Sequence, residues 1–190
     1  MEQERILNPS ESLNIITEAI IKTKMNLQGN SFYFLLWGWL VASASFAFFA
    51  LQNWTDFRYF FLPFPISATI GVILSLWHYN KYKSKTFETY LGYFLSRLWL
   101  VLGLSFFVVV FASVSQNTAP FAYTMVIAGI GTLVSGLAMK FRPLTLGGTL
   151  FFVFAIASIY LPDPFKVLLN GIAIMLGYLI PGYMLKSSKG

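Results

Sequence analysis

Six long runs of apolar residues follow one another from about residue 32 to the end of the chain, and charged residues, Pro or Asn separate them. A helix needs about 20 apolar residues to cross a hydrocarbon core about 30 Å thick. The connections are short, so consecutive helices should pack antiparallel in one bundle. The pattern predicts an all-α integral membrane bundle with six transmembrane helices, at about residues 32–51, 59–77, 91–114, 121–139, 144–161 and 165–185.

The residues before the first run have a helical pattern of their own. Asn8 can cap a helix, Pro9 suits its first turn, and Glu11 lies three residues after the cap, as in a capping box. We therefore expect a short amphipathic helix over 9–27 and a linker up to residue 30, followed by the transmembrane domain over 31–190. One face of that helix carries Leu13, Ile16, Ile20 and Leu27.

Two interpretations of this amphipathic helix are open. An amphipathic helix can lie on the inner membrane surface. It can also place its apolar face in a groove of a cytoplasmic protein.

Composition excludes a soluble fold. Of the 190 residues 57% are hydrophobic and 18% aromatic, but only 11% are charged, against about 25% in ordinary soluble domains. Thirteen basic and seven acidic side chains cannot cover the surface of such a chain in water. The solvent around most of the chain is therefore lipid.

The basic residues predict an orientation, because cytoplasmic loops retain Lys and Arg during insertion. With six crossings, the other side would hold only Arg58 and Lys166, and Arg97 would lie in or at the edge of the third run. Both termini are therefore expected in the cytoplasm. The basic side would hold Arg5, Lys22, Lys24, Lys81, Lys83, Lys85, Lys140, Arg142, Lys186 and Lys189.

Residue types that usually carry chemistry are scarce. The chain has no cysteine, and His78 is its one histidine. Because a lone imidazole without a cluster of carboxylates cannot build a metal site, no metal and no catalytic site is expected. No cofactor or nucleotide motif is visible either, and no basic tract interleaves with aromatics as in nucleic-acid binders. His78 is interpreted as an interfacial ring with a polar tip.

Arg97 is the most informative ionisable residue, since a charge at membrane depth is costly and is a functional candidate by default. It either lies near the midplane and needs a partner, or its side chain reaches the inner headgroups. Glu88, nine residues earlier, lies about half a turn away around the helix and cannot simply pair with it. Asn170 is the one amide expected within a span, so ion-coupled transport has little support.

Small residues recur at helical spacing, which lets two backbones approach closely. The fourth run is the richest, with Gly131 near its centre, and Pro181 with Gly182 marks a kink or break in the sixth. Packing within the bundle is one explanation of these stripes. A homodimer face or a hinge is the other.

The first span also carries a resemblance. The stretch from Glu11 to Ile21, followed by Gly29-Asn30-Ser31-Phe32-Tyr33-Phe34-Leu35-Leu36-Trp37-Gly38-Trp39-Leu40, resembles the start of small multi-pass membrane proteins from Bacteroidota. The most specific element is the aromatic-Trp-Gly-Trp sequence, and the likeness covers about residues 10–51. It implies a helical bundle in a bacterial cytoplasmic (inner) membrane and transfers no catalytic or binding residue.

These patterns favour a non-enzymatic membrane protein that acts as a subunit, regulator or sensor through its cytoplasmic face. Its surfaces would be the helix over 9–27, for a cytoplasmic partner, and the basic loop Lys81–Lys85. The alternative is a small transporter or channel with a path near Arg97 and the glycine-rich fourth span. Besides lipid, a second copy of the chain is a candidate partner. Basic residues that can contact lipid headgroups are Lys81, Lys83, Lys85, Lys140 and Arg142.

Overall fold

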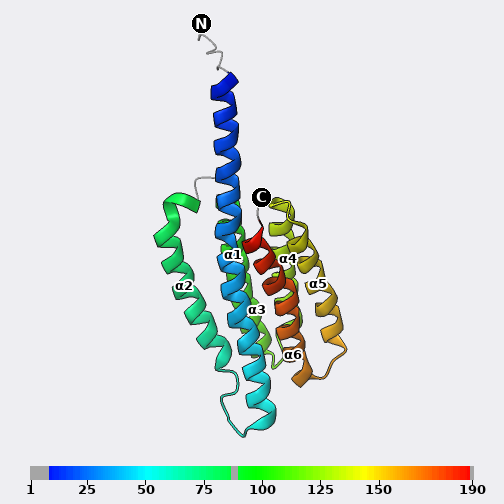
Figure 1. The fold of residues 1–190 in the computed structure, drawn as a ribbon. Coiled ribbons are helices and arrows are strands. Elements are labelled where there is room, and N and C mark those ends of the chain that lie inside the picture. The colour runs from blue at the N-terminus through cyan, green and yellow to red at the C-terminus, as the bar shows by residue number, and fades with distance from the viewer. Residues whose placement is uncertain (1–8, 87–89, 189–190) are drawn as a thin grey trace.

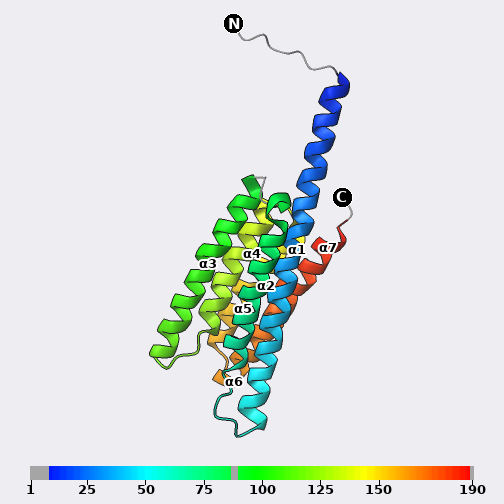
Figure 2. The ribbon, with the colours of Figure 1, turned by 90° about the vertical axis from the view of Figure 1, so that its left-hand side faces the viewer.

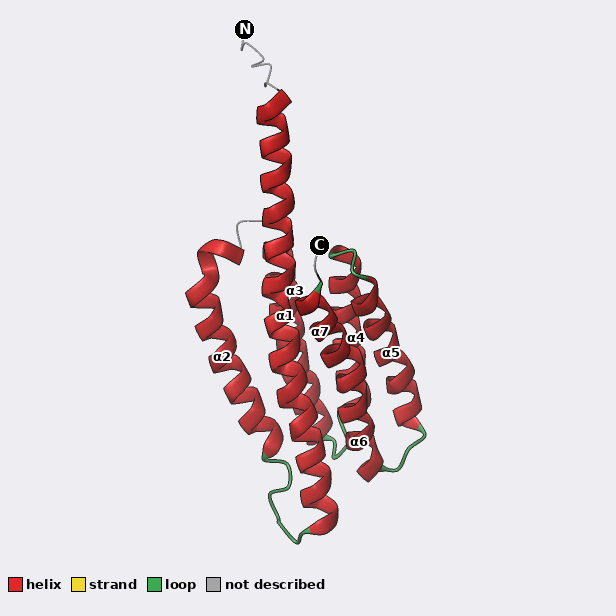
Figure 3. Cartoon of the chain, in the orientation of Figure 1, coloured by secondary structure: helices red, strands yellow, loops and turns green. Residues whose placement is uncertain are grey.

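A computed structural model describes residues 9–86 and 90–188, and every regular element in these ranges is a helix (Figures 1 and 3). The predicted all-α bundle is confirmed. Its elements are α1 (Pro9–Trp54), α2 (Pro63–Thr86), α3 (Tyr90–Ser115), α4 (Phe121–Ala138), α5 (Arg142–Ile159), α6 (Asp163–Ile174), the π-helical turn η1 (Met175–Leu179) and α7 (Ile180–Ser187).

Five segments in the described ranges are long and apolar enough to cross a membrane, which indicates a multi-pass membrane protein. They are Ser31–Trp54 of α1, then α3, α4, α5 and the continuous segment Asp163–Ser187. The remaining predicted span, at about residues 59–77, corresponds to α2, which is not among the five. Prolines at its start and the polar sequence His78-Tyr79-Asn80 near its end make this helix less apolar.

The bounds of α2 differ from the prediction at both ends. The helix begins at Pro63 rather than near residue 59 because Pro suits a first turn and lacks the N–H that a later position must donate. It also continues to Thr86, so the segment Lys81–Lys85 is helical and not the basic loop that we expected. Lysine is a good helix former, and positive charge is favourable at a helix C-terminus.

Helix α1 runs without interruption from Pro9 to Trp54, so the break expected at residues 28–30 is absent. Helix α1 contains no proline after Pro9. The glycine at the expected break, Gly29, costs a helix only about 1 kcal/mol. Both views of the ribbon show the N-terminal part of α1 standing clear of the other helices, at the end of the bundle where the C-terminus also lies (Figures 1 and 2).

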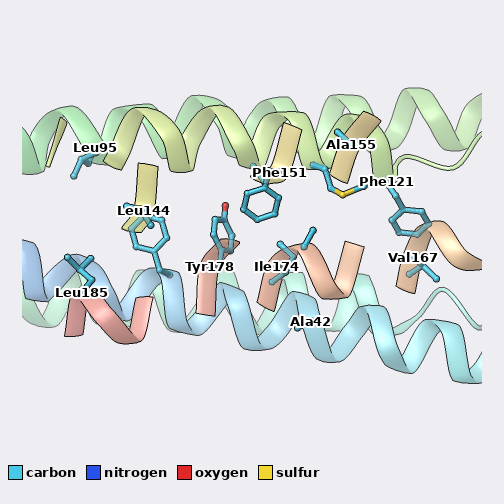
Figure 4. Packing of buried hydrophobic residues seen from close by; sticks show 14 of the residues in the cluster. Ala42, Leu95, Phe121, Leu144, Phe151, Ala155, Val167, Ile174, Tyr178 and Leu185 are labelled. Carbon is cyan, nitrogen blue, oxygen red and sulfur yellow. The ribbon is translucent and has the colours of Figure 1, made fainter. Parts of the chain in front are cut away.

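The bundle is organised around α1, which contacts α2, α6, η1 and α7 (Figure 1). Helices α4 and α5 form a closely packed hairpin, and α3 packs on α4. Between these groups lies a core that includes the fully buried side chains of Met125, Leu144 and Phe151. Figure 4 shows the core running along the bundle between α1 and the helices opposite it.

Glycines allow the close approach of α4 and α5. An ideal Cβ built on Gly136 would lie 2.5 Å from the backbone nitrogen of Thr145, and one built on Gly129 would lie 3.1 Å from the Cβ of Phe151. On another face of α4, a Cβ on Gly131 would lie 2.8 Å from the Trp99 ring of α3. The small residues of the fourth span therefore pack within the bundle.

Candidate functional site at the basic end

The two ends of the bundle differ in charge. In the ranges 31–81 and 90–188, where side chains are described, the acidic residues are Asp56 and Asp163, both at the end opposite the chain termini. There Lys166 Nζ lies 2.7 Å from Asp163 Oδ1, and Arg58 adds one further positive charge. The other end, which we call the basic end, carries Lys81, Lys140, Arg142 and Lys186.

Lys140 is placed by the way α4 ends. Its backbone φ is 52°, in the left-handed region that favours glycine. The N–H of Phe141 donates to the carbonyl of Gly136 (2.9 Å) and the N–H of Lys140 to that of Leu137 (3.1 Å), which is the Schellman pattern. Lysine therefore occupies a strained position at this end of the bundle.

Arg97 lies on the exposed surface of α3, with its guanidinium carbon 5.2 Å from the centroid of the Tyr93 ring. Its depth follows from a nearby contact: Trp99 Nε1 donates a hydrogen bond of 3.2 Å to Ser135 Oγ. Ser135 lies one turn before the end of α4, so Arg97, which is nearer the start of α3 than Trp99, lies close to the basic end.

His78 belongs to an aromatic contact between α2 and α1. Its ring stacks on Phe32 with centroids 3.9 Å apart and an interplanar angle of 8°, and its Nδ1 lies 3.3 Å from the Tyr33 hydroxyl. Partial burial and the positive charge of Lys81 hold the pKa of His78 below its ordinary value. This environment favours the neutral form of the ring, which joins the two helices near the basic end.

Asn170 lies inside the bundle, 4% exposed, and not at the basic end. Its side-chain nitrogen donates to the hydroxyl of Ser45 on α1 (3.0 Å), and that hydroxyl donates to the Val41 carbonyl (2.8 Å). The amide is thus a contact between α6 and α1. Sequence reasoning identified Asn170 but not its partner, which is 125 positions away.

The kink expected at Pro181 takes the form of the π-helical turn η1, which ends two residues earlier. Proline cannot donate to the carbonyl four residues back, and its ring crowds that carbonyl, here the one of Gly177. Across the interface, an ideal Cβ on Gly147 of α5 would lie only 2.6 Å from the Gly177 oxygen. The wider turn therefore lies where α5 packs closely against this segment.

Tyr178 in η1 is a buried residue that sequence reasoning missed. Its ring makes edge contacts with Phe34, Trp99 and Phe151 at centroid distances of 5.7, 6.1 and 5.1 Å. Figure 4 shows the Tyr178 and Phe151 rings side by side. One tyrosine among ten carries no signal in the sequence that separates it from the others.

The basic end thus combines residues of α2, α5, α7 and the turn after α4 with the start of the membrane-spanning part of α1. Glu88 lies outside the described residues, and of Lys83 and Lys85 only the helical backbone is described. Within the described part of the chain, no group of three or more His, Cys, Asp or Glu side chains is placed to hold a metal ion. Comparisons of the chain with models of protein families, with curated proteins and with solved structures found no match.

Proposed function

We propose that the protein is a non-enzymatic, six-span protein of the bacterial cytoplasmic membrane that acts as a subunit, regulator or sensor. Its N-terminal helical extension binds a cytoplasmic protein. The observation that carries this proposal is the uninterrupted α1, whose N-terminal part stands clear of the bundle (Figures 1 and 2).

Orientation is the first step of the proposal. Among the residues whose side chains are described, most basic residues lie at the end where α1 projects. The opposite end carries two acidic and two basic residues. Cytoplasmic loops are enriched in Lys and Arg. We therefore assign the basic end, both termini and the projecting part of α1 to the cytoplasm.

The sixth crossing is the second step. Helix α2 lies alongside α1 and contacts it, and no charged side chain occurs between Arg58 and Lys81. Many of its side chains are apolar and exposed, among them Ile66, Ile73 and Leu76 at 53%, 60% and 58%. A helix with this outer surface is suited to lipid, which supports a crossing by α2 despite its modest hydropathy.

Mechanical coupling is the third step. Residues 9–30 extend α1 by about 33 Å at 1.5 Å per residue. The same helix contacts α2, α6, η1 and α7. A partner bound to the extension is therefore connected to the bundle through one uninterrupted helix. The apolar residues Leu13, Ile16, Ile20 and Leu27 lie on one face by their spacing and would bind the partner.

The test is affinity purification from native membranes in mild detergent, followed by mass spectrometry of the co-purifying proteins. We compare the full chain with Ile16→Ser/Ile20→Ser on the apolar face and with the matched control Glu18→Ser/Lys22→Ser on the opposite face. We expect a stoichiometric cytoplasmic protein with the full chain and the control, and its loss with the apolar-face variant. If the full chain purifies alone, or all three retain the same proteins, the proposal is wrong.

A further inference from the structure

An apolar groove with one positive charge at its rim lies where α1 and α7 meet. Its volume is about 370 Å³, within the range of small-ligand sites. The walls are mostly apolar, and Lys186 supplies the charge. The residues that line the groove are Ser31, Phe32, Leu35, Leu36, Trp39, Leu40 and Lys186.

The two helices of the groove have a fixed register. Gly182 of α7 lies against Leu35 and Phe34, since an ideal Cβ there would be 3.1 and 3.4 Å from their side chains. The helices are antiparallel, so Lys186, four residues further along α7, lies level with about Ser31. Deeper in, Trp39 Nε1 donates to the Tyr183 hydroxyl (3.0 Å) and joins the two helices. The charge therefore lies at the end of the groove nearest the basic end.

The depth of the groove corresponds to one leaflet. From Ser31 to Leu40 the helix rises about 14 Å, and half of a hydrocarbon core about 30 Å thick is about 15 Å. A groove that is apolar over this depth and positively charged at its headgroup end is complementary to a lipid with one anionic headgroup and an extended acyl chain.

We propose that this groove is a binding site for an anionic phospholipid of the inner leaflet. The acyl chain lies along Leu36, Trp39 and Leu40, and the phosphate is held by Lys186. Trp39 is 53% exposed beside the groove, so its ring can contact the acyl chain. This site is separate from the N-terminal extension and does not depend on the proposed protein partner.

The test uses the full chain in vesicles of phosphatidylcholine mixed with phosphatidylglycerol, followed by native mass spectrometry of the lipids that stay bound after detergent extraction. We expect preferential retention of phosphatidylglycerol and about a fivefold weaker retention with Lys186→Gln, the effect of one basic residue near an anionic surface. The control is Arg58→Gln, which removes one positive charge at the opposite end of the bundle and outside the groove, and it should retain phosphatidylglycerol as the parent chain does.

A second measurement locates the acyl chain of the bound lipid. Phospholipids with brominated acyl chains quench nearby indoles, so the loss of tryptophan fluorescence on adding them should be smaller in Trp39→Phe than in the parent protein. Three outcomes overturn the proposal: equal retention of both lipids, equal loss in the Lys186 and Arg58 variants, or a disulfide-linked dimer formed by Leu36→Cys in membranes. The last outcome is readable because the chain has no cysteine of its own, and it would assign the groove to a second copy.

Discussion

The Asn170 side chain donates a hydrogen bond of 3.0 Å to the Ser45 hydroxyl, and both residues are buried between α6 and α1. Ser45 in turn donates to the Val41 carbonyl. Polar contacts between helices in a membrane contribute about 0.6 kcal/mol on average and up to about 1.7 kcal/mol. This pair therefore fixes the register of α6 on α1 more than it supplies the stability of the bundle.

We expect Asn170→Ala to lower the free energy of unfolding in detergent by about 1 to 2 kcal/mol, because it removes the hydrogen bond and some packing. Ser45→Ala should cost about 1 kcal/mol. The double variant should lose less than the sum of the two, since both single changes remove the same bond. Strict additivity in this cycle, measured by steric trapping or denaturant unfolding, would show that the bond contributes nothing.

The close contact between Gly147 and the Gly177 carbonyl predicts a sharp difference between two glycines. Gly147→Ala would place its Cβ 2.6 Å from a backbone oxygen, so α5 and η1 must move apart. We expect destabilisation of about 1 to 3 kcal/mol, as for other overpacked sites. A shift in the thermal midpoint of the purified protein measures it.

Gly103 is the control for this substitution. No atom lies within 4 Å of a Cβ built there, and the residue is exposed on α3. Gly103→Ala should therefore be neutral or stabilise by up to about 1 kcal/mol through helix propensity. Similar losses at both positions would contradict the role of the η1 contact.

Periodicity and length predicted most of the fold because both reflect the main driving force for this chain, the burial of apolar helices in lipid. The bounds of α4 were predicted to within a residue, since Pro120 and Lys140 flank it. The length of α1 was not predicted, because we expected a helix over 9–27 and a linker up to residue 30 before the first span. A weak helix former costs little when both flanking segments are helical.

The contacts inside the bundle were less predictable than the spans. Ser45 and Tyr178 belong to residue types that occur many times in the chain, and tertiary contact alone distinguishes them. Pro181 did predict a deviation from α-helix. Its form as a π turn, and the close approach of Gly147 from α5 beside it, are not contained in any local pattern.

The strained position of Lys140 predicts a stabilising substitution. A left-handed conformation costs a non-glycine residue about 1 to 2 kcal/mol, so Lys140→Gly should raise the unfolding free energy by about 1 kcal/mol in neutral detergent. Asn117, with φ 53° at the end of α3, is the matched position, and Asn tolerates this region better. Asn117→Gly should gain less, and an equal gain at both positions would contradict the argument.

The pKa of His78 gives the bundle a pH dependence. The folded protein holds this pKa below the ordinary value of 6.5, so the unfolded chain binds a proton more readily. The corresponding stability is present above pH 6.5 and is lost as the pH falls below that value through the folded pKa. Thermal unfolding followed by near-ultraviolet circular dichroism should show a falling midpoint below pH 6.5, and His78→Phe, which keeps a ring against Phe32, should lack this component. An identical pH profile for the two proteins would assign the effect to carboxylates.

The crossing by α2 is decided by the sides on which its two ends lie. The chain has no cysteine, so Asp56→Cys before α2 and Asn80→Cys near its end each provide a single thiol. If α2 crosses and the basic end is cytoplasmic, a membrane-impermeant maleimide added to intact cells labels Asp56→Cys at once and Asn80→Cys only after permeabilisation. Gln116→Cys, after α3, should behave like Asp56→Cys. Labelling of Asp56→Cys and Asn80→Cys from the same side would instead mean that α2 does not cross and that the chain has five crossings. The two chain termini would then lie on opposite sides of the membrane. In that case the N-terminal extension and Lys186 could not both face the cytoplasm.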